Sequence, residues 1–212
     1  SITARSVEVL DAHRLIPTVI ELLEIARAEC KPVHLNLPTD IANSLSQDSR
    51  ARHEVIGIRK WEGAQRGLEP VAREGIGRFL ASERPIFFVG NGLKLSGLAG
   101  PFLETLRKNP IPFIVSCHGK GLVSEDHPFF RGVFGFAANG EAESFLEQYR
   151  PDAIFFLGTS LGELSTGGWA RALGQPELRL HADWDPGRFN ETYSMKYQIC
   201  ADIAEVLQEM ID

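Results

Sequence analysis

The chain has 212 residues, of which 43% are hydrophobic, and its formal net charge is −6 at pH 7. This length allows one large domain, or one domain with a fragment of another, and the composition argues against disorder over most of the chain. The negative charge and the absence of a basic run argue against nucleic-acid binding, and no apolar stretch is long enough to span a membrane. Three cysteines without Cys-x-x-Cys spacing argue against a disulfide framework or a zinc site, and predict a reducing cytoplasm.

One helix and one strand are predicted near the N-terminal end. Over residues 11–29 the apolar side chains recur at helical spacing, and Asp11 can cap the first turn. Pro17 predicts that the regular helix starts near Ile16 or kinks there. Residues 33–37 alternate between apolar and polar, which predicts a strand. Such a pair cannot form a domain alone, so we expect it to pack beside the main sheet or to end another domain.

The rest of the chain predicts a regular alternation of strands and helices. Residues 42–66 are polar without a sustained period, and we expect them to form a linker at a domain boundary. Beyond them, strands are predicted at 85–89, 112–115, 152–157 and 178–182, and helices at 67–81, 96–108, 139–149 and 201–211. Strands such as 85–89 are apolar on both faces, and strands alternate with helices, which together indicate a parallel sheet with helices on both sides. We therefore expect residues 67–212 to form a doubly wound, Rossmann-like three-layer α/β domain.

Small or polar residues follow each predicted strand, where ligands bind in sheets of this kind. Backbone amides in glycine-rich turns can bind phosphate, and an acid after a later strand can bind a ribose or adenine. The candidate nucleotide-binding residues are Gly90, Asn91, Gly92, Gly158, Thr159 and Asp183. The alternative is that tight strand-to-helix turns need glycine anyway, and the first loop lacks the third glycine of a dinucleotide fingerprint. Both interpretations stay open at this point.

Two further motifs predict other chemistry only weakly. Residues 158–162 match the Gly-x-Ser-x-Gly elbow of serine hydrolases, but the acid and histidine that must follow Ser160 are not in the required arrangement. The only later histidine is His181, and the aspartates all come after it. His181, Asp183 and Asp185 alternate and could hold a metal if the strand persisted. An Asp-x-Asp-Pro segment more often ends a strand and turns the chain, so we predict no metal site.

Five segments, taken in order, carry a resemblance to a known family. They are Lys-Pro-Val-His-Leu-Asn-Leu-Pro-Thr-Asp at 31–40, Arg-Pro-Ile-Phe-Phe-Val-Gly-Asn-Gly at 84–92, Gly-Lys-Gly-Leu-Val-Ser-Glu-Asp-His-Pro at 119–128, Asp-Ala-Ile-Phe-Phe-Leu-Gly at 152–158 and His-Ala-Asp-Trp-Asp-Pro at 181–186. The first is similar to the end of the pyrimidine-binding domain of thiamine-diphosphate-dependent enzymes of the acetolactate synthase and 2-oxoacid decarboxylase superfamily. The other four resemble successive strands and loops of that superfamily's central domain.

The resemblance implies a domain organisation and a set of absent parts. Residues 1–41 would be the C-terminal piece of the pyrimidine-binding domain, 42–66 a linker, and 67–212 the central domain. The family's catalytic glutamate and its Gly-Asp-Gly motif for magnesium and diphosphate are not found. We therefore expect a fragment without catalytic residues, from a homo-oligomer whose thiamine diphosphate and Mg²⁺ sites lie in the missing pyrimidine- and diphosphate-binding domains. The alternatives are a stand-alone nucleotide-binding module and a purely structural spacer.

Central domains of this superfamily hold flavin adenine dinucleotide, adenosine diphosphate or no nucleotide. The flavin-binding acetolactate synthases carry an Arg-x-Asp-x-Arg-like stretch after the third strand. The matching stretch here is Ser-Leu-Gly-Glu-Leu at 160–164, which lacks both arginines. Because charge-assisted contacts are about twice as strong as neutral ones, we predict no tight flavin site and only a weak adenine-nucleotide site around Gly90, Gly92, Gly158 and Asp183. The choice between carboligation and decarboxylation stays open.

Overall fold

The computed structural model describes residues 2–44, 67–136, 138–189 and 192–212. Most of the predicted linker, 45–66, lies outside the described residues. Backbone contacts divide the chain into two compact units, Ser1–Glu62 and Gly63–Asp212. No helix within the described ranges is long and apolar enough to cross a membrane.

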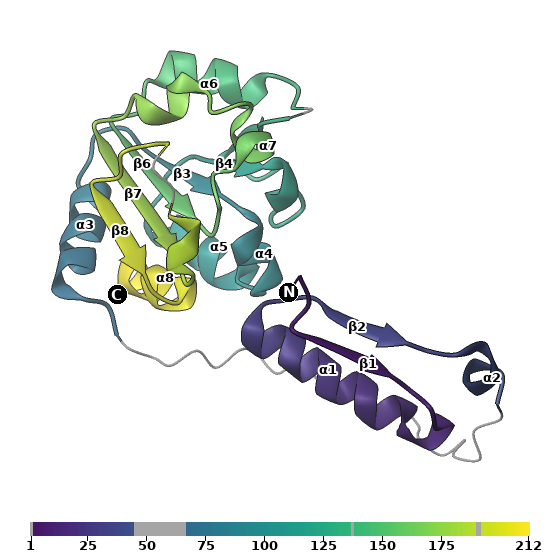
Figure 1. Cartoon of the computed structure of the whole chain (residues 1–212). Helices are drawn as coiled ribbons and strands as arrows, with labels where there is room; N and C mark the ends of the chain where they lie inside the picture. The colour runs from purple at the N-terminus through teal and green to yellow at the C-terminus, as the bar shows by residue number, and fades with distance from the viewer. Residues whose placement is uncertain (1, 45–66, 137, 190–191) are drawn as a thin grey trace. The chain divides into compact units, whose positions relative to one another are not determined.

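The first unit is a two-stranded parallel sheet with one long helix (Figure 1). Its elements are β1 (Arg5–Glu8), a 3-10 turn (Ala12–Arg14), α1 (Leu15–Glu29), β2 (Val33–Asn36) and the short α2 (Thr39–Ala42). The sequence predicted only one strand here, because Val7 is the single apolar residue of β1. Asp11 caps the 3-10 turn by accepting from the His13 amide at 3.0 Å. Pro17 lies in the first turn of α1, where its missing N–H has no intrahelical partner to lose.

The second unit confirms the predicted doubly wound α/β fold. Its six strands are all parallel, in the order β5-β4-β3-β6-β7-β8. They are β3 (Pro85–Val89), β4 (Phe113–Ser116), β5 (Phe130–Phe134), β6 (Ala153–Leu157), β7 (Leu178–Asp183) and β8 (Tyr197–Cys200). The chain moves outward from β3 to β5, then crosses back to begin the other half at β6. The switch point of the sheet therefore lies between β3 and β6, where ligands bind in folds of this class.

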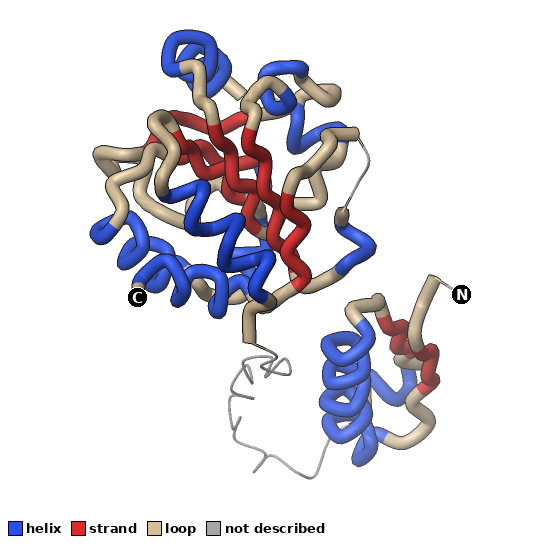
Figure 2. The backbone as a smooth tube through the Cα atoms, turned by 90° about the vertical axis from the view of Figure 1, so that its left-hand side faces the viewer, coloured by secondary structure: helices blue, strands red, loops and turns tan. Residues whose placement is uncertain are grey.

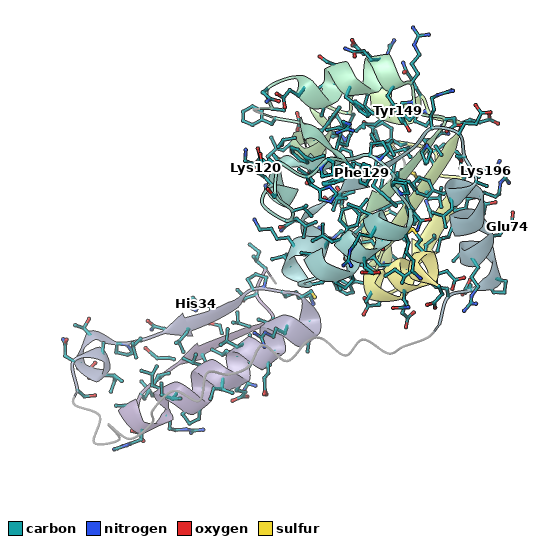
Figure 3. All side chains as sticks on the ribbon, turned by 180° about the vertical axis from the view of Figure 1, so that it is seen from behind. His34, Glu74, Lys120, Phe129, Tyr149 and Lys196 are labelled. Atoms are coloured by element: carbon teal, nitrogen blue, oxygen red, sulfur yellow. The ribbon has the colours of Figure 1, made fainter. Side chains whose placement is uncertain are left out.

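Helices cover both faces of this sheet (Figures 1 and 2). They are α3 (Pro70–Leu80), α4 (Asn91–Leu95), α5 (Ala99–Lys108), α6 (Glu141–Tyr149), α7 (Glu163–Thr166) and α8 (Ile203–Ile211). Side chains from α3, α5 and α8 pack on one face of the sheet, and side chains from α6 pack on the other. Fully buried phenylalanines dominate both cores, as Phe79, Phe87 and Phe155 do on the first face. Figure 3 draws the described side chains on the ribbon of the chain.

Three predictions about this unit were wrong in detail. The helix expected over 96–108 begins only at Ala99, as α5, and the short α4 before it was not predicted; Gly97 separates the two helices with φ +67°. The region after β4, expected to be a loop, contains β5, whose Gly132 adopts φ +105°. The pairing of β5 with β4 shifts register around this glycine, which indicates a β-bulge. The edge strand β8 was also missed, because it is short and alternates between buried and exposed residues.

Candidate functional site

The predicted nucleotide-binding residues all lie at the carboxyl ends of three adjacent strands. Gly90 follows β3, and Asn91 and Gly92 begin α4. Gly158 and Thr159 follow β6, which is the neighbour of β3 across the switch point, and Asp183 ends β7. The structure therefore places this set at the position where the fold class binds its ligands. Whether these residues bind a nucleotide stays a prediction.

The loops after β3 and β6 are joined by direct backbone contacts. The Gly90 amide donates to the Leu157 carbonyl at 2.8 Å, and the Gly92 amide donates to the Gly158 carbonyl at 2.9 Å. A Cβ atom on Gly90 would lie 2.5 Å from the Thr159 Cβ, and one on Gly92 would lie 2.8 Å from the Gly158 Cα. These two glycines are therefore needed for packing, whether or not a ligand binds, and their amides are engaged within the protein.

The loop after β6 is tied equally closely to β7. Gly158 adopts φ +60°, which favours glycine, and its amide donates to the Ala182 carbonyl at 3.0 Å. The Thr159 hydroxyl accepts from the Leu161 amide at 3.3 Å. The Thr159 carbonyl accepts from the His181 Nε2 at 2.7 Å. A third amide of the predicted phosphate cradle is thus already hydrogen-bonded to a neighbouring strand.

The Asp183 carboxylate organises the turn that follows β7. The side chain is buried, and its Oδ1 accepts from the Asp185 amide at 3.0 Å. Burial raises the pKa of the Asp183 carboxyl above its usual range, while its bond to the Asp185 amide and the nearby Arg188 charge act in the opposite direction. One carboxylate oxygen is therefore used to turn the chain, as expected for an Asp-x-Asp-Pro segment. A ribose or adenine could contact this side chain only through its remaining surface.

The structure separates the residues of the two competing motifs. His181 is fully buried, and its Nε2 bonds to Thr159 rather than to the elbow residue Ser160. β7 ends at Asp183, so Asp185 does not continue the alternation of the strand. Within the described ranges, no group of three or more His, Cys, Asp or Glu side chains is placed to hold a metal ion.

Cationic side chains beside this edge of the sheet are engaged in other contacts. The Lys94 ammonium, on α4, donates to the Lys120 carbonyl at 2.9 Å. The Lys120 ammonium pairs with Glu125 at 2.9 Å. The sequence did not single out Lys94, because a lysine at a helix end carries no recognisable motif. The stretch 160–164, where arginines are expected in a flavin-binding domain, ends at the half-exposed Leu164 on α7.

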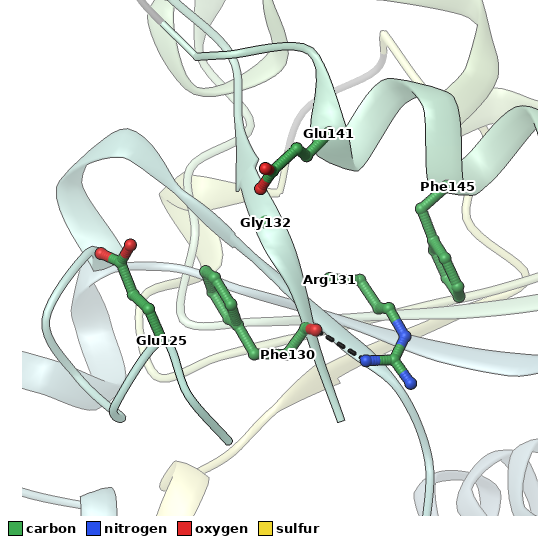
Figure 4. Close-up of a pocket in the computed structure, with 6 residues that line it drawn as sticks. All are labelled: Glu125, Phe130, Arg131, Gly132, Glu141 and Phe145. Carbon is green, nitrogen blue, oxygen red and sulfur yellow. Dashed lines mark hydrogen bonds between the residues drawn. The ribbon is translucent and has the colours of Figure 1, made fainter. Parts of the chain in front are cut away.

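A separate surface pocket lies at the outer strand β5, away from the predicted residues. Its volume is about 370 Å³, and it is lined by Glu125, Phe130, Arg131, Gly132, Glu141 and Phe145 (Figure 4). The Arg131 guanidinium donates to the Phe130 carbonyl at 2.7 Å and lies 5.4 Å from the centre of the Phe145 ring. These contacts occupy a backbone carbonyl of the edge strand β5, which disfavours pairing with a further strand. This pocket could not be predicted from the sequence, because β5 itself was not predicted.

Comparison with known proteins identifies one family for the second unit. Residues 74–210 match the model of the thiamine pyrophosphate enzyme central domain. A Mycobacterium tuberculosis protein named "Putative acetolactate synthase large subunit IlvB2" is 32% identical over 169 residues, 76% of this chain and 30% of that protein. The acetolactate synthase isozyme 3 large subunit of Escherichia coli is 24% identical over 181 residues, 85% of this chain and 31% of that protein. Pyruvate decarboxylase 1 of Pisum sativum is 28% identical over 162 residues, 76% of this chain and 26% of that protein. The chain therefore spans less than a third of the length of these relatives.

Proposed function

The chain belongs to the thiamine pyrophosphate enzyme family, whose central domain it carries, and we propose that this domain serves as a structural, non-catalytic part of an enzyme that acts on 2-oxo acids. The main support for a structural role is that the loops after β3 and β6 contact each other directly. The Gly90 and Gly92 amides, which would have to cradle a phosphate, donate instead to Leu157 and Gly158. A preformed diphosphate site needs such amides free.

Within the described residues, no side-chain cluster points to a site for thiamine diphosphate and its metal. Mg²⁺ at a diphosphate is held by one or two carboxylates together with the phosphate oxygens. The described part of the chain holds no group of three or more acidic, histidine or cysteine side chains placed around one point. We propose that the cofactor and its metal are bound by the pyrimidine- and diphosphate-binding domains of a longer, homo-oligomeric protein. The relatives' names cover both acetolactate synthesis and pyruvate decarboxylation, so the proposal specifies the substrate only as a 2-oxo acid.

The first unit supports the proposal of a longer protein, because it is an incomplete sheet. Two parallel strands with a helix rarely stand alone, since parallel sheets are usually buried on both faces. One face of this sheet carries polar cross-strand pairs. Ser6 Oγ lies 2.9 Å from His34 Nδ1, and Asn36 Nδ2 donates to Glu8 Oε1 at 2.8 Å. We propose that this unit is the C-terminal piece of the pyrimidine-binding domain.

Calorimetry tests the absence of the thiamine diphosphate site. The purified chain, titrated with thiamine diphosphate and Mg²⁺, should give no stoichiometric isotherm and should not turn over pyruvate. A clear isotherm at one site per chain would contradict the proposal. The chain should also be colourless, and flavin absorbance near stoichiometry would show that the two missing arginines do not prevent flavin binding.

The second candidate function is a weak adenine-nucleotide site, favoured by the convergence of Gly158, Thr159 and Asp183 at the switch point. Titration with adenosine diphosphate should then show half-saturation near 1 mM, which corresponds to about −4 kcal/mol. The matched control is Asp183→Asn, which keeps the shape of the side chain and its amide contact but removes the charge. Equal affinities for the two proteins would place any binding elsewhere.

A further inference from the structure

The buried side chain of His181 has a feature that the proposed function does not use. The imidazole is fully buried, and its Nε2 lies 2.7 Å from the Thr159 carbonyl. A carbonyl only accepts, so Nε2 carries the proton and Nδ1 carries a lone pair. Nδ1 is buried and has no hydrogen-bond partner among the described residues. Buried nitrogens without a partner are rare, because each one costs free energy.

The surroundings of this imidazole are mostly aromatic. The Phe189 ring meets it edge-on at 5.0 Å between ring centres, and the Phe156 ring does so at 6.3 Å. Phe156 is its register neighbour on β6, and Gln198 is its neighbour on β8. A charge on the ring would therefore be held in a mostly apolar environment, where the described residues offer Nδ1–H no acceptor.

The ionisable groups on the elements around His181 are few. Asp183 is the next residue on the same face of β7 and is buried. Asp185 and Arg188 form an ion pair at 3.4 Å beyond the strand, and Glu163 is exposed on α7. None of these charges sets the pKa of His181. Burial lowers the pKa from 6.5 to about 4, and the bond to the Thr159 carbonyl opposes this shift only in part.

The loop held by this bond is not a relaxed structure. Leu161 adopts φ +51°, in the left-handed region that side chains avoid. A local bond holds this residue, from the Leu161 amide to the Thr159 hydroxyl at 3.3 Å. The hydrogen bond from the His181 side chain joins β7 to the Thr159 backbone, directly after Gly158. A loop in this conformation depends on such links.

We propose that His181 is an acid-sensitive latch: its neutral ring holds the loop 158–162 against β7, and a proton on Nδ1 releases the loop into solvent. In the closed loop the protonated ring has a buried charge and a donor without an acceptor. In the open loop, water solvates the charge and accepts a hydrogen bond from Nδ1–H. Protons therefore bind the open form more tightly, and opening becomes more favourable as the pH falls from 6.5 towards 4.

Hydrogen exchange of the whole chain, followed by mass spectrometry between pH 7 and pH 4, tests the latch. Protection factors are compared, because they remove the intrinsic pH dependence of exchange. The reporters are the Gly158 and Leu161 amides, which are bonded to Ala182 and Thr159. With an open-state pKa of 6.5 and a closed-state pKa of about 4, loop protection should fall about 20-fold by pH 5 and about 100-fold by pH 4. Protection of β3 should stay constant over this range.

Three variants separate the latch from other effects. His181→Gln keeps an amide donor but cannot titrate, so its loop protection should not change with pH. His181→Phe fills the space without a donor, so its loop should be unprotected even at pH 7. Asp183→Asn removes the neighbouring carboxyl and should keep the acid release. Constant loop protection in the wild type, parallel loss in β3, or acid release in His181→Gln would each overturn the proposal, whatever the outcome of the nucleotide titrations.

Discussion

Replacing Gly90 by alanine tests whether the two loops at the switch point are interlocked. Gly90 has φ −99° and ψ −175°, which alanine adopts freely, so the substitution adds only a methyl group. That methyl would lie against the Gly158 carbonyl and 2.5 Å from the Thr159 Cβ. The Gly158 backbone cannot easily move, because its carbonyl accepts from Gly92 and its amide donates to Ala182. The loops must therefore separate to accommodate the methyl.

The expected loss of stability follows from these contacts. Overpacking costs about 1–3 kcal/mol where side chains can shift, and here the obstacle is backbone. Separation of the loops also weakens the bonds of the Gly90 and Gly92 amides, each worth about 1 kcal/mol. We expect Gly90→Ala to lower the free energy of unfolding by roughly 3–5 kcal/mol. The matched control is Gly77→Ala on the exposed side of α3, where a Cβ meets nothing within 4 Å. It should raise stability by about 0.5–1 kcal/mol.

Urea unfolding followed by circular dichroism measures both changes. The slope with urea concentration should match the wild type in each variant, so that midpoints report stability directly. If Gly90→Ala unfolds within 1 kcal/mol of the wild type, the loops are not interlocked, and the glycine would have to serve some purpose other than packing.

Two other substitutions probe how the sheet is held, with the same unfolding assay. Asp152→Ala should cost about 2–4 kcal/mol, because its carboxylate accepts from the Arg84 amide at 2.9 Å and the Glu83 amide at 3.1 Å. Asp152→Asn keeps one acceptor oxygen, so its loss of stability should be about half that of Asp152→Ala. Equal losses in the two variants would contradict the view that both carboxylate oxygens accept a stabilising hydrogen bond. Phe79→Ala should cost about 3–5 kcal/mol in the fully buried core, whereas Val71→Ala, on the exposed side of α3, should change stability by less than about 0.5 kcal/mol. Similar losses at these two positions would mean that α3 is not packed as described.

The central strands could be predicted from the sequence because their chemistry is uniform. Residues 85–89 and 153–157 are apolar throughout. A short segment that is apolar on both faces indicates a strand that is covered on both sides. The edge strands lack that signal. β5 contains Arg131 and the bulged Gly132, and the short β8 alternates with its outer face exposed. Edge strands are shaped by the need to avoid further pairing, which removes the pattern that identifies a strand.

The location of the candidate site could be predicted, but the use of its groups could not. Alternating strands and helices fix a switch point, and the glycines after β3 and β6 mark it. A glycine that lets a phosphate approach and a glycine that lets another backbone approach are identical in a sequence. The difference depends on which residues lie opposite Gly90 in the fold. These residues are Gly158 and Thr159, which are far from Gly90 in the sequence.

The same limit applies to His181, and it connects the two proposals made for this edge of the sheet. The sequence placed this histidine on a strand, but only the coordinates show that one nitrogen is bonded and the other is not. Because the Gly92 and Gly158 amides are engaged when the loop is closed, a phosphate can reach them only after the loop opens. A ligand that needs the open loop binds the protonated latch better than the neutral one. A nucleotide at this edge would therefore bind more tightly at pH 5 than at pH 7, and His181→Gln would abolish that difference, whereas binding to the closed loop would show no such dependence on His181.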